Sequence, residues 1–191
     1  MKKVLVIDNY DSFTYNLVHI LRELGMSDSM EVHRNDKISV EYADQFEHIL
    51  LSPGPGLPKD AGIMPELIKR YASTKNMLGV CLGHQGISEN FGGSLFNLSQ
   101  VFHGIATKAI LTKEHDNLFA GLPEEFMVCR YHSWAVVPKS IPTELLVTAV
   151  DEVGNVMAVK HRTYNVRGVQ FHPESIMTEH GIQMINNWLS I

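Results

Sequence analysis

Short apolar runs alternate with helical patterns along the first half of the chain. The runs predict buried strands at residues 3–8, 30–33, 48–51 and 77–81. Apolar residues at helical spacing predict helices between them, over about residues 17–24, 62–72 and 85–91. This β-α-β order favours a parallel, doubly wound sheet, because right-handed crossovers return each strand to the same sheet.

Strands dominate the second half of the chain, from residue 94 to about residue 170. They are predicted at residues 105–111, 126–131, 145–150 and 156–161, and a last helix at about 179–189. We interpret these strands as antiparallel additions to the main sheet, together with a small side sheet. No repeat or linker interrupts the pattern. We therefore predict one α/β domain over residues 1–191, a flavodoxin-like open twisted sheet that is mostly parallel, with helices on both faces.

Composition and charge exclude several classes of protein. Hydrophobic residues make up 45% of the 191 positions and charged residues 19%, which is typical of a globular protein with a full core. The net charge is −5 and no basic cluster occurs, so we expect no nucleic-acid partner. No apolar run approaches the ~20 residues of a membrane helix, so we expect no membrane partner. Two cysteines make no disulfide scaffold, and we expect a cytoplasmic protein.

Residues 79–85, Gly-Val-Cys-Leu-Gly-His-Gln, carry the sharpest chemical signal. A strand runs through a Gly-x-Cys-x-Gly turn into a helix, which is the geometry of a nucleophile elbow with Cys81 as the nucleophile. Flanking glycines suit such a strained turn, and the helix N-terminus favours a thiolate. A buried structural cysteine remains an alternative from this fragment alone. Cys129, inside an apolar strand pattern, is expected to be a small core residue.

A histidine and a carboxylate follow another predicted strand, at His172 and Glu174. On an extended segment they face the same side, so Glu174 can orient His172 while the imidazole faces a third group. Taken alone, a histidine near a strand end is usually a surface residue. Because the carboxyl ends of parallel strands share one sheet edge, we expect His172 to meet Cys81 there and to act as its base.

The turn-rich segment 52–56, Ser-Pro-Gly-Pro-Gly, follows a third strand. Such a rigid loop can aim an N–H at a developing oxyanion, opposite the N–H of Leu82, although an ordinary tight turn is the alternative. Neither phosphate-binding glycine motif is present. Ten histidines show no metal-ligand spacing, so we predict no metal site. We expect surface or core polar roles for His103, His115, His132 and His161.

Residues 79–85 together with His172-Pro173-Glu174 resemble the class I glutamine amidotransferases, in family order and over essentially the whole chain. Residues 8–17, 52–56 and 130–133 narrow the resemblance to the glutaminase components of anthranilate synthase and aminodeoxychorismate synthase. The resemblance implies Cys81 as nucleophile, His172 as acid and base, and Glu174 as the carboxylate that orients His172. It implies that the backbones of Gly56 and Leu82 form the oxyanion hole. The implied glutamine-binding residues are Gly54, Pro55, Gly56, Leu82, Gln85, Ser133 and Trp134.

Two positions depart from the family pattern, which often has Lys at the place of Ile105 and Leu at the place of Trp134. If Trp134 contributes through its main chain, its change is tolerable. The change at Ile105 affects contact with a partner, and the sequence does not define whether it strengthens or weakens that contact.

The implied reaction releases ammonia from L-glutamine. The chain continues only a short way past Glu174, so we expect a large chorismate-binding synthase subunit to consume the ammonia. The product is then anthranilate, 4-amino-4-deoxychorismate or both, and the residues do not separate these cases. The resemblance implies no cofactor in this chain and magnesium in the partner. It places residues 10–16 near the partner, although a helix-cap or core role for Phe13 is equally open.

Three alternatives come from other classes. One is a stand-alone cysteine γ-glutamyl hydrolase on the same fold. Another is a silent binding module, against which the intact set of Cys81, His172 and Glu174 argues. The third keeps the glutaminase but changes the acceptor, as in carbamoyl phosphate or guanylate synthesis, where relatives usually carry extra domains.

Overall fold

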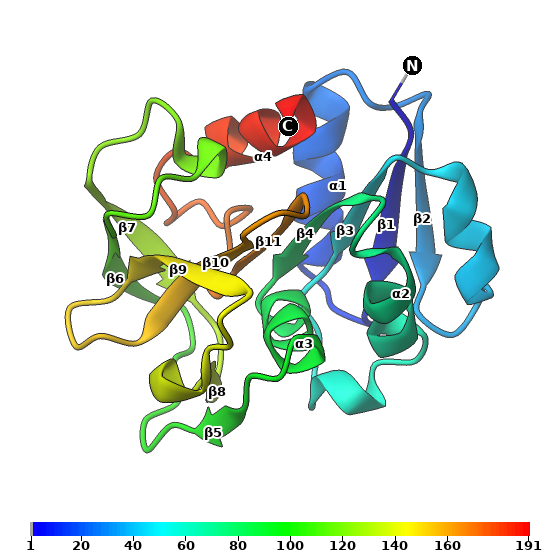
Figure 1. Ribbon diagram of the computed structural model, residues 1–191. Helices are drawn as coiled ribbons and strands as arrows, with labels where there is room; N and C mark the ends of the chain where they lie inside the picture. Colours follow the sequence, from blue (N-terminus) through cyan, green and yellow to red (C-terminus); the bar gives the residue numbers. More distant parts are fainter. Residues whose placement is uncertain (1) are drawn as a thin grey trace.

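One nine-stranded sheet organises the chain, whose computed structural model describes residues 2–191 (Figure 1). Its strands are β1 (Val4–Asp8), β2 (Met30–Arg34), β3 (His48–Leu51), β4 (Asn76–Val80), β6 (Ile105–Leu111), β7 (Glu125–Arg130), β9 (Leu145–Val150), β10 (Val156–His161) and β11 (Val166–Val169). A separate two-stranded sheet pairs β5 (Leu95–Asn97) with β8 (Trp134–Val136). The α-helices are α1 (Thr14–Glu23), α2 (Met64–Tyr71), α3 (Leu82–Asn90) and α4 (Gly181–Ser190). Short 3₁₀ turns are η1 (Val40–Gln45), η2 (Pro58–Asp60), η3 (Asn117–Phe119) and η4 (Pro138–Ser140).

The strand order across the main sheet is β2-β1-β3-β4-β11-β10-β9-β6-β7. Neighbours from β2 to β11 run parallel, and β10, β9, β6 and β7 continue the sheet in antiparallel fashion. The predicted flavodoxin-like sheet, with antiparallel additions and a small side sheet, is confirmed. Because β1, β3, β4 and β11 are parallel neighbours, the segments that follow them meet at one edge.

Helices cover both faces of this sheet, as the sequence pattern predicts. Side chains alternate along β1, with Val4 and Val6 in one apolar core and Leu5 and Ile7 in the other. Helices α1 and α4 pack into the first core, and α2 and α3 pack into the second (Figure 1). No helix within residues 2–191 combines the length and apolar character needed to cross a membrane.

The segment after β11 departs from the predicted extended conformation. The strand ends at Val169, His172 lies in irregular chain beyond it, and Glu174 lies in the turn that follows. Pro173 has no N–H to continue a strand ladder, and the Ser175 N–H closes a turn by donating to the His172 carbonyl at 3.2 Å. The two side chains therefore meet because the chain turns back, and not because they alternate along a strand.

Gly83 and Gly86, both in α3, allow a comparison that tests how closely this helix approaches the sheet. A Cβ on Gly83 would lie 2.5 Å from the backbone oxygen of Leu51, which cannot move without breaking the sheet. A Cβ on Gly86 would meet the flexible end of Met64, at 2.9 Å. We expect Gly83→Ala to lower the free energy of unfolding by about 3 kcal/mol or more. Gly86→Ala should change it by no more than about 1 kcal/mol.

Urea denaturation of the two variants measures this difference. Equal stability of the two alanine variants would contradict the close approach of α3 to β3.

Candidate active site

Cys81 occupies the turn between β4 and α3, with φ 52° and ψ −97°. Helix α3 begins at Leu82, three residues earlier than the sequence predicted, so the chain passes from strand to helix through this one residue. Positive φ is strained for a residue with a side chain, and only close packing holds it. A Cβ on Gly79 would lie 2.4 Å from the carbonyl carbon of Gly83, so Gly79 has no room for a side chain, and the backbone of Leu51 excludes one at Gly83. The predicted elbow geometry is present.

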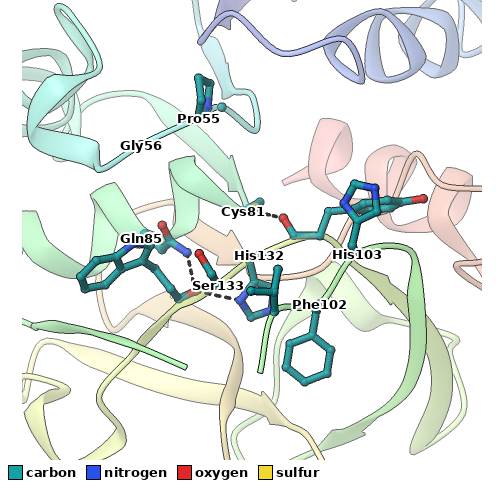
Figure 2. A pocket seen from close by; sticks show the side chains of 12 residues that line it. Pro55, Gly56, Cys81, Gln85, Phe102, His103, His132 and Ser133 are labelled. Carbon is teal, nitrogen blue, oxygen red and sulfur yellow. Dashed lines mark hydrogen bonds between the residues drawn. The ribbon is translucent and has the colours of Figure 1, made fainter. Parts of the chain in front are cut away.

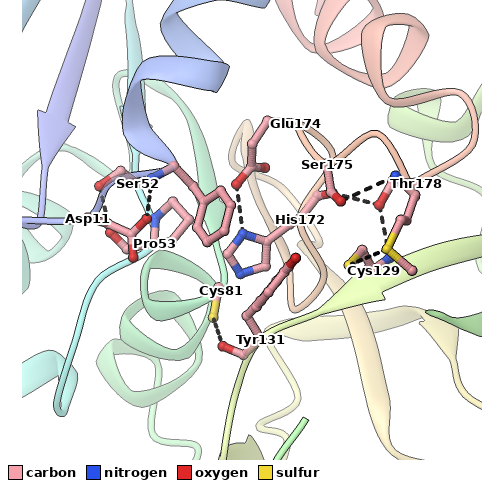
Figure 3. A network of polar contacts seen from close by, with 12 residues as sticks. Asp11, Ser52, Pro53, Cys81, Cys129, Tyr131, His172, Glu174, Ser175 and Thr178 are labelled. Atoms are coloured by element: carbon pink, nitrogen blue, oxygen red, sulfur yellow. Dashed lines mark hydrogen bonds and ion pairs between the residues drawn. The ribbon is translucent and has the colours of Figure 1, made fainter. Parts of the chain in front are cut away.

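His172 is buried between the carboxylate of Glu174 and the sulfur of Cys81 (Figure 3). Its Nδ1 lies 2.7 Å from Glu174 Oε1, and both side chains are almost fully enclosed. Its Nε2 is also buried, and among residues 2–191 it has no hydrogen-bond partner. The arrangement places a base next to a thiol and a carboxylate behind the base.

The surroundings of His172 favour its charged form. Burial alone would lower the pKa of the imidazole, but the neighbouring Cys81 and Glu174 outweigh burial and raise the pKa of His172 from 6.5 to about 10. The group therefore carries a proton at neutral pH. Since the pKa is raised on folding, its contribution to stability is fully present below pH 6.5 and is lost as the pH rises toward 10.

Two aromatic side chains pack on the ring of His172. Phe13 lies edge-on at a ring-centroid distance of 5.5 Å, and Tyr131 lies edge-on at 5.2 Å. The two also contact each other at 4.9 Å. Phe13 is the N-cap residue of α1 and packs on two aromatic rings. It therefore has the helix-cap and core role that was one of the two possibilities left open by the sequence.

The loop at residues 52–56 is anchored by Asn9. The Asn9 backbone N–H donates to Ser52 Oγ at 2.8 Å, and Asn9 Nδ2 donates to the Ser52 carbonyl, also at 2.8 Å. A Cβ on Gly54 would lie 2.6 Å from Asn9 and 2.7 Å from Leu82, so the loop packs tightly against the start of α3. Gly56 has φ +77°, which favours glycine, and lies on the pocket.

A cavity of about 280 Å³ opens beside Cys81 (Figure 2). Its walls include these residues named from the sequence: Gly54, Pro55, Gly56, Cys81, Gln85, Ser133 and Trp134. Leu82, His172 and Glu174 do not line it. The Leu82 side chain borders a neighbouring cavity. His172 lies behind this wall, next to Cys81 and Tyr131, which do line the cavity.

Five further wall residues were not predicted from the sequence: Val101, Phe102, His103, Tyr131 and His132. Residues 98–104 have no periodic pattern, so no signal identified the first three. Tyr131 and His132 belong to the 130–133 block that carries the resemblance, which is the signal that could have found them. His132 and His161 are buried polar residues and His103 and His115 are exposed, as expected, but His103 and His132 also belong to the pocket.

Trp134 contributes its main-chain carbonyl to this wall. The carbonyl accepts from Gln85 Nε2 at 2.8 Å and from His132 Nδ1 at 2.7 Å (Figure 2). Arg130 Nε donates to the other nitrogen of His132 at 3.0 Å, and Arg130 pairs with Asp151 at 2.8 Å. An arginine can only donate, so His132 is neutral with its proton on Nδ1. Burial and the Arg130 charge lower the pKa of His132 to about 3.

Comparison with known proteins identifies the family. The model of the family "Glutamine amidotransferase class-I" matches residues 5–191. The chain belongs to the class I glutamine amidotransferases and is an enzyme of that class. The resemblance inferred from the motifs is thereby confirmed.

Relatives narrow the similarity within the family. The anthranilate synthase component 2 of Pseudomonas aeruginosa is 47% identical over 97% of this chain and 94% of its own length. The aminodeoxychorismate/anthranilate synthase component 2 of Bacillus subtilis is 43% identical over 97% and 95%. The chain spans only 32% of the bifunctional protein TrpGD of Thermotoga maritima, at 40% identity. A Thermoplasma acidophilum structure described as that of a GMP synthase subunit superposes with a TM-score of 0.88 at 27% identity, covering 100% of this chain and 93% of that one.

The charge of His172 should depend on Glu174. In Glu174→Gln the carboxylate is gone while the ring stays buried, so we expect the pKa of His172 to fall well below about 10. Titration of the histidine ring nitrogens by NMR measures this change. Glu152→Gln, at an exposed residue of the β9–β10 turn, is the control and should leave His172 unchanged. An unchanged titration in Glu174→Gln would show that Glu174 does not set the charge of the ring.

Proposed function

We propose that this chain hydrolyses L-glutamine to glutamate and ammonia with Cys81, His172 and Glu174 as its catalytic triad. The observation that carries the proposal is the position of His172, between the Glu174 carboxylate and the Cys81 sulfur. The adjoining cavity of about 280 Å³ is at the small end of ligand sites and suits a single amino acid.

In the proposed reaction the Cys81 thiolate attacks the carbon of the glutamine side-chain amide. The backbone N–H groups of Gly56 and Leu82 bind the oxyanion, and the first N–H groups of a helix have no partner within the helix. The His172 imidazolium then protonates the departing ammonia. Water activated by His172 hydrolyses the γ-glutamyl thioester to glutamate. Each oxyanion donor is worth roughly 10²–10³ in rate.

The remaining wall residues are proposed to hold the amino-acid part of glutamine. Gln85 donates its Nε2 hydrogens to neighbours within the protein, so its Oε1 is the group left to accept from the substrate. Gly54, Pro55, Ser133 and the main chain of Trp134 complete the binding set. Because the Trp134 carbonyl already anchors Gln85, the role needs no particular side chain at that position.

We further propose that the ammonia passes to a large chorismate-binding synthase subunit. The support is the names of the relatives, which are component 2 proteins of anthranilate and aminodeoxychorismate synthases. The product would be anthranilate, 4-amino-4-deoxychorismate or both. We propose a cytoplasmic location, no cofactor in this chain and magnesium in the partner. A stand-alone γ-glutamyl hydrolase is the alternative, and it would work without a partner.

The partner is proposed to dock where apolar side chains are exposed beside Glu174. Ile176 is fully exposed, Tyr15 is 64% exposed and Ile182 is 50% exposed. A hollow of about 610 Å³ lies between α1 and the segment before α4, and Glu174 forms part of its wall. An apolar surface of this kind, next to the catalytic carboxylate, suits a protein partner. Ile105 is also exposed, at 41%.

The two cysteines give a matched test of the nucleophile. We expect Cys81→Ala to abolish glutamine-dependent ammonia release, because the attacking sulfur is gone. Cys129 is fully buried in β7, so Cys129→Ala should keep wild-type activity after a stability loss of about 1 kcal/mol. A coupled glutamate assay with thermal melting measures both. Near wild-type ammonia release by folded Cys81→Ala would exclude the proposed chemistry.

The docking face has its own test in Ile182→Asp. A charge in the centre of an apolar interface should weaken binding to the large subunit by at least tenfold, while glutamine hydrolysis by the isolated chain is retained. Val153→Asp is the control, because Val153 is 83% exposed at the β9–β10 turn, away from this face. Titration calorimetry with the purified subunit gives both affinities. Equal affinities would show that the partner binds elsewhere.

A further inference from the structure

Gln170 contacts both Cys81 and Gln85 from behind the pocket wall, and the mechanism above gives it no role. It follows β11 directly and is fully buried. Its Nε2 lies 3.6 Å from the sulfur of Cys81, and its Oε1 lies 3.2 Å from Gln85 Nε2. Its backbone N–H donates to the Met157 carbonyl on β10 at 2.8 Å, so the sheet fixes the base of the side chain.

The chemistry of the neighbours decides which end of the Gln170 amide faces the sulfur. The carbonyl of Trp134 can only accept, so the Gln85 group that contacts it at 2.8 Å is the NH₂. That NH₂ also faces Gln170, so the Gln170 group opposite it is the carbonyl oxygen. The remaining end of Gln170, next to the Cys81 sulfur, is therefore an N–H donor.

The hydrogen bonds on the other side of the Trp134 carbonyl also have a fixed direction. Arg130 can only donate, so His132 must accept on Nε2 and donate from Nδ1 to the Trp134 carbonyl. The Trp134 carbonyl thus accepts hydrogen bonds from both His132 and Gln85. The donor and the acceptor are therefore defined in each of these contacts. The side chain of Gln170 is held by contacts at both ends.

We propose that Gln170 is a positioning residue that donates an N–H to the Cys81 sulfur and fixes the amide orientation of Gln85. A donor that faces sulfur stabilises the thiolate relative to the thiol. It also holds the sulfur at the edge of the pocket, beside His172. Through its oxygen, Gln170 keeps the Gln85 NH₂ turned inward, so that Gln85 offers its oxygen to the substrate. The role of Gln85 in this inference rests on the proposed function, but the contact with the sulfur does not.

Two variants distinguish the loss of the hydrogen-bond donor from the loss of side-chain packing. Gln170→Met has a similar length and no donor, and Gln170→Glu has nearly the same shape but, when ionised, offers only acceptors. The readout is the rate of Cys81 alkylation by iodoacetamide, followed by peptide mass from pH 5.5 to 9. Glutaminase kcat and KM are measured alongside, and circular dichroism melting checks that each variant folds.

We expect Gln170→Met to slow Cys81 alkylation at pH 7 by about tenfold, which corresponds to about 1.4 kcal/mol for one hydrogen bond to a charged group. At pH 8 we expect Cys81 alkylation in Gln170→Glu to be slowed, relative to wild type, by more than in Gln170→Met. The rate in Gln170→Glu relative to wild type should recover as the pH falls, because a protonated carboxyl again donates to the sulfur and accepts from Gln85. A loss of packing alone would lower this ratio to a similar degree at every pH and would not produce the recovery.

Alkylation within twofold of wild type for Gln170→Met, or a Gln170→Glu ratio that does not change with pH, would overturn the inference. The proposed function is judged separately. If the wild-type chain releases no ammonia from glutamine while alkylation still depends on Gln170, the contact with the sulfur stands and the glutaminase proposal fails.

Discussion

The tight passage from β4 into α3 is the constraint on which the site depends. It places Cys81 at positive φ, and it exists only because Gly79 and Gly83 let two backbone segments approach within a distance that no Cβ permits. Gly83 in turn lies against Leu51, so the position of the sulfur is tied to the centre of the parallel sheet. The close packing of β4, α3 and β3 therefore holds Cys81 in its strained conformation.

Environment gives opposite charge states to two histidines near this turn. His172 is buried beside a carboxylate and the sulfur, and its pKa rises to about 10. His132 is buried beside a guanidinium, and its pKa falls to about 3. The first can deliver a proton, and the second can only hold a fixed hydrogen-bond direction. Arg130 ends β7 and pairs with Asp151, which follows β9, so the antiparallel half of the sheet is part of the site as well as of the core.

Most strands of the sheet could be predicted from the sequence, because buried parallel strands are continuous apolar runs. The proximity of Cys81 and His172 could also be predicted, because the carboxyl ends of parallel strands share one edge of the sheet. The contact between His172 and Glu174 was predicted from an extended segment, whereas in the structure it comes from a turn at Pro173. The sequence did not identify Phe102, whose loop has no periodicity. Hydrogen-bond directions between residues distant in sequence depend on tertiary contacts, which no local pattern encodes.

The most direct test of the account is to trap the covalent intermediate. The protein is mixed rapidly with glutamine, quenched in acid, digested and examined by peptide mass spectrometry. The account predicts a γ-glutamyl thioester on the peptide that contains Cys81, formed within the first turnover and sensitive to hydroxylamine. Continued ammonia release with no adduct on Cys81, or with the adduct on Cys129, would contradict it.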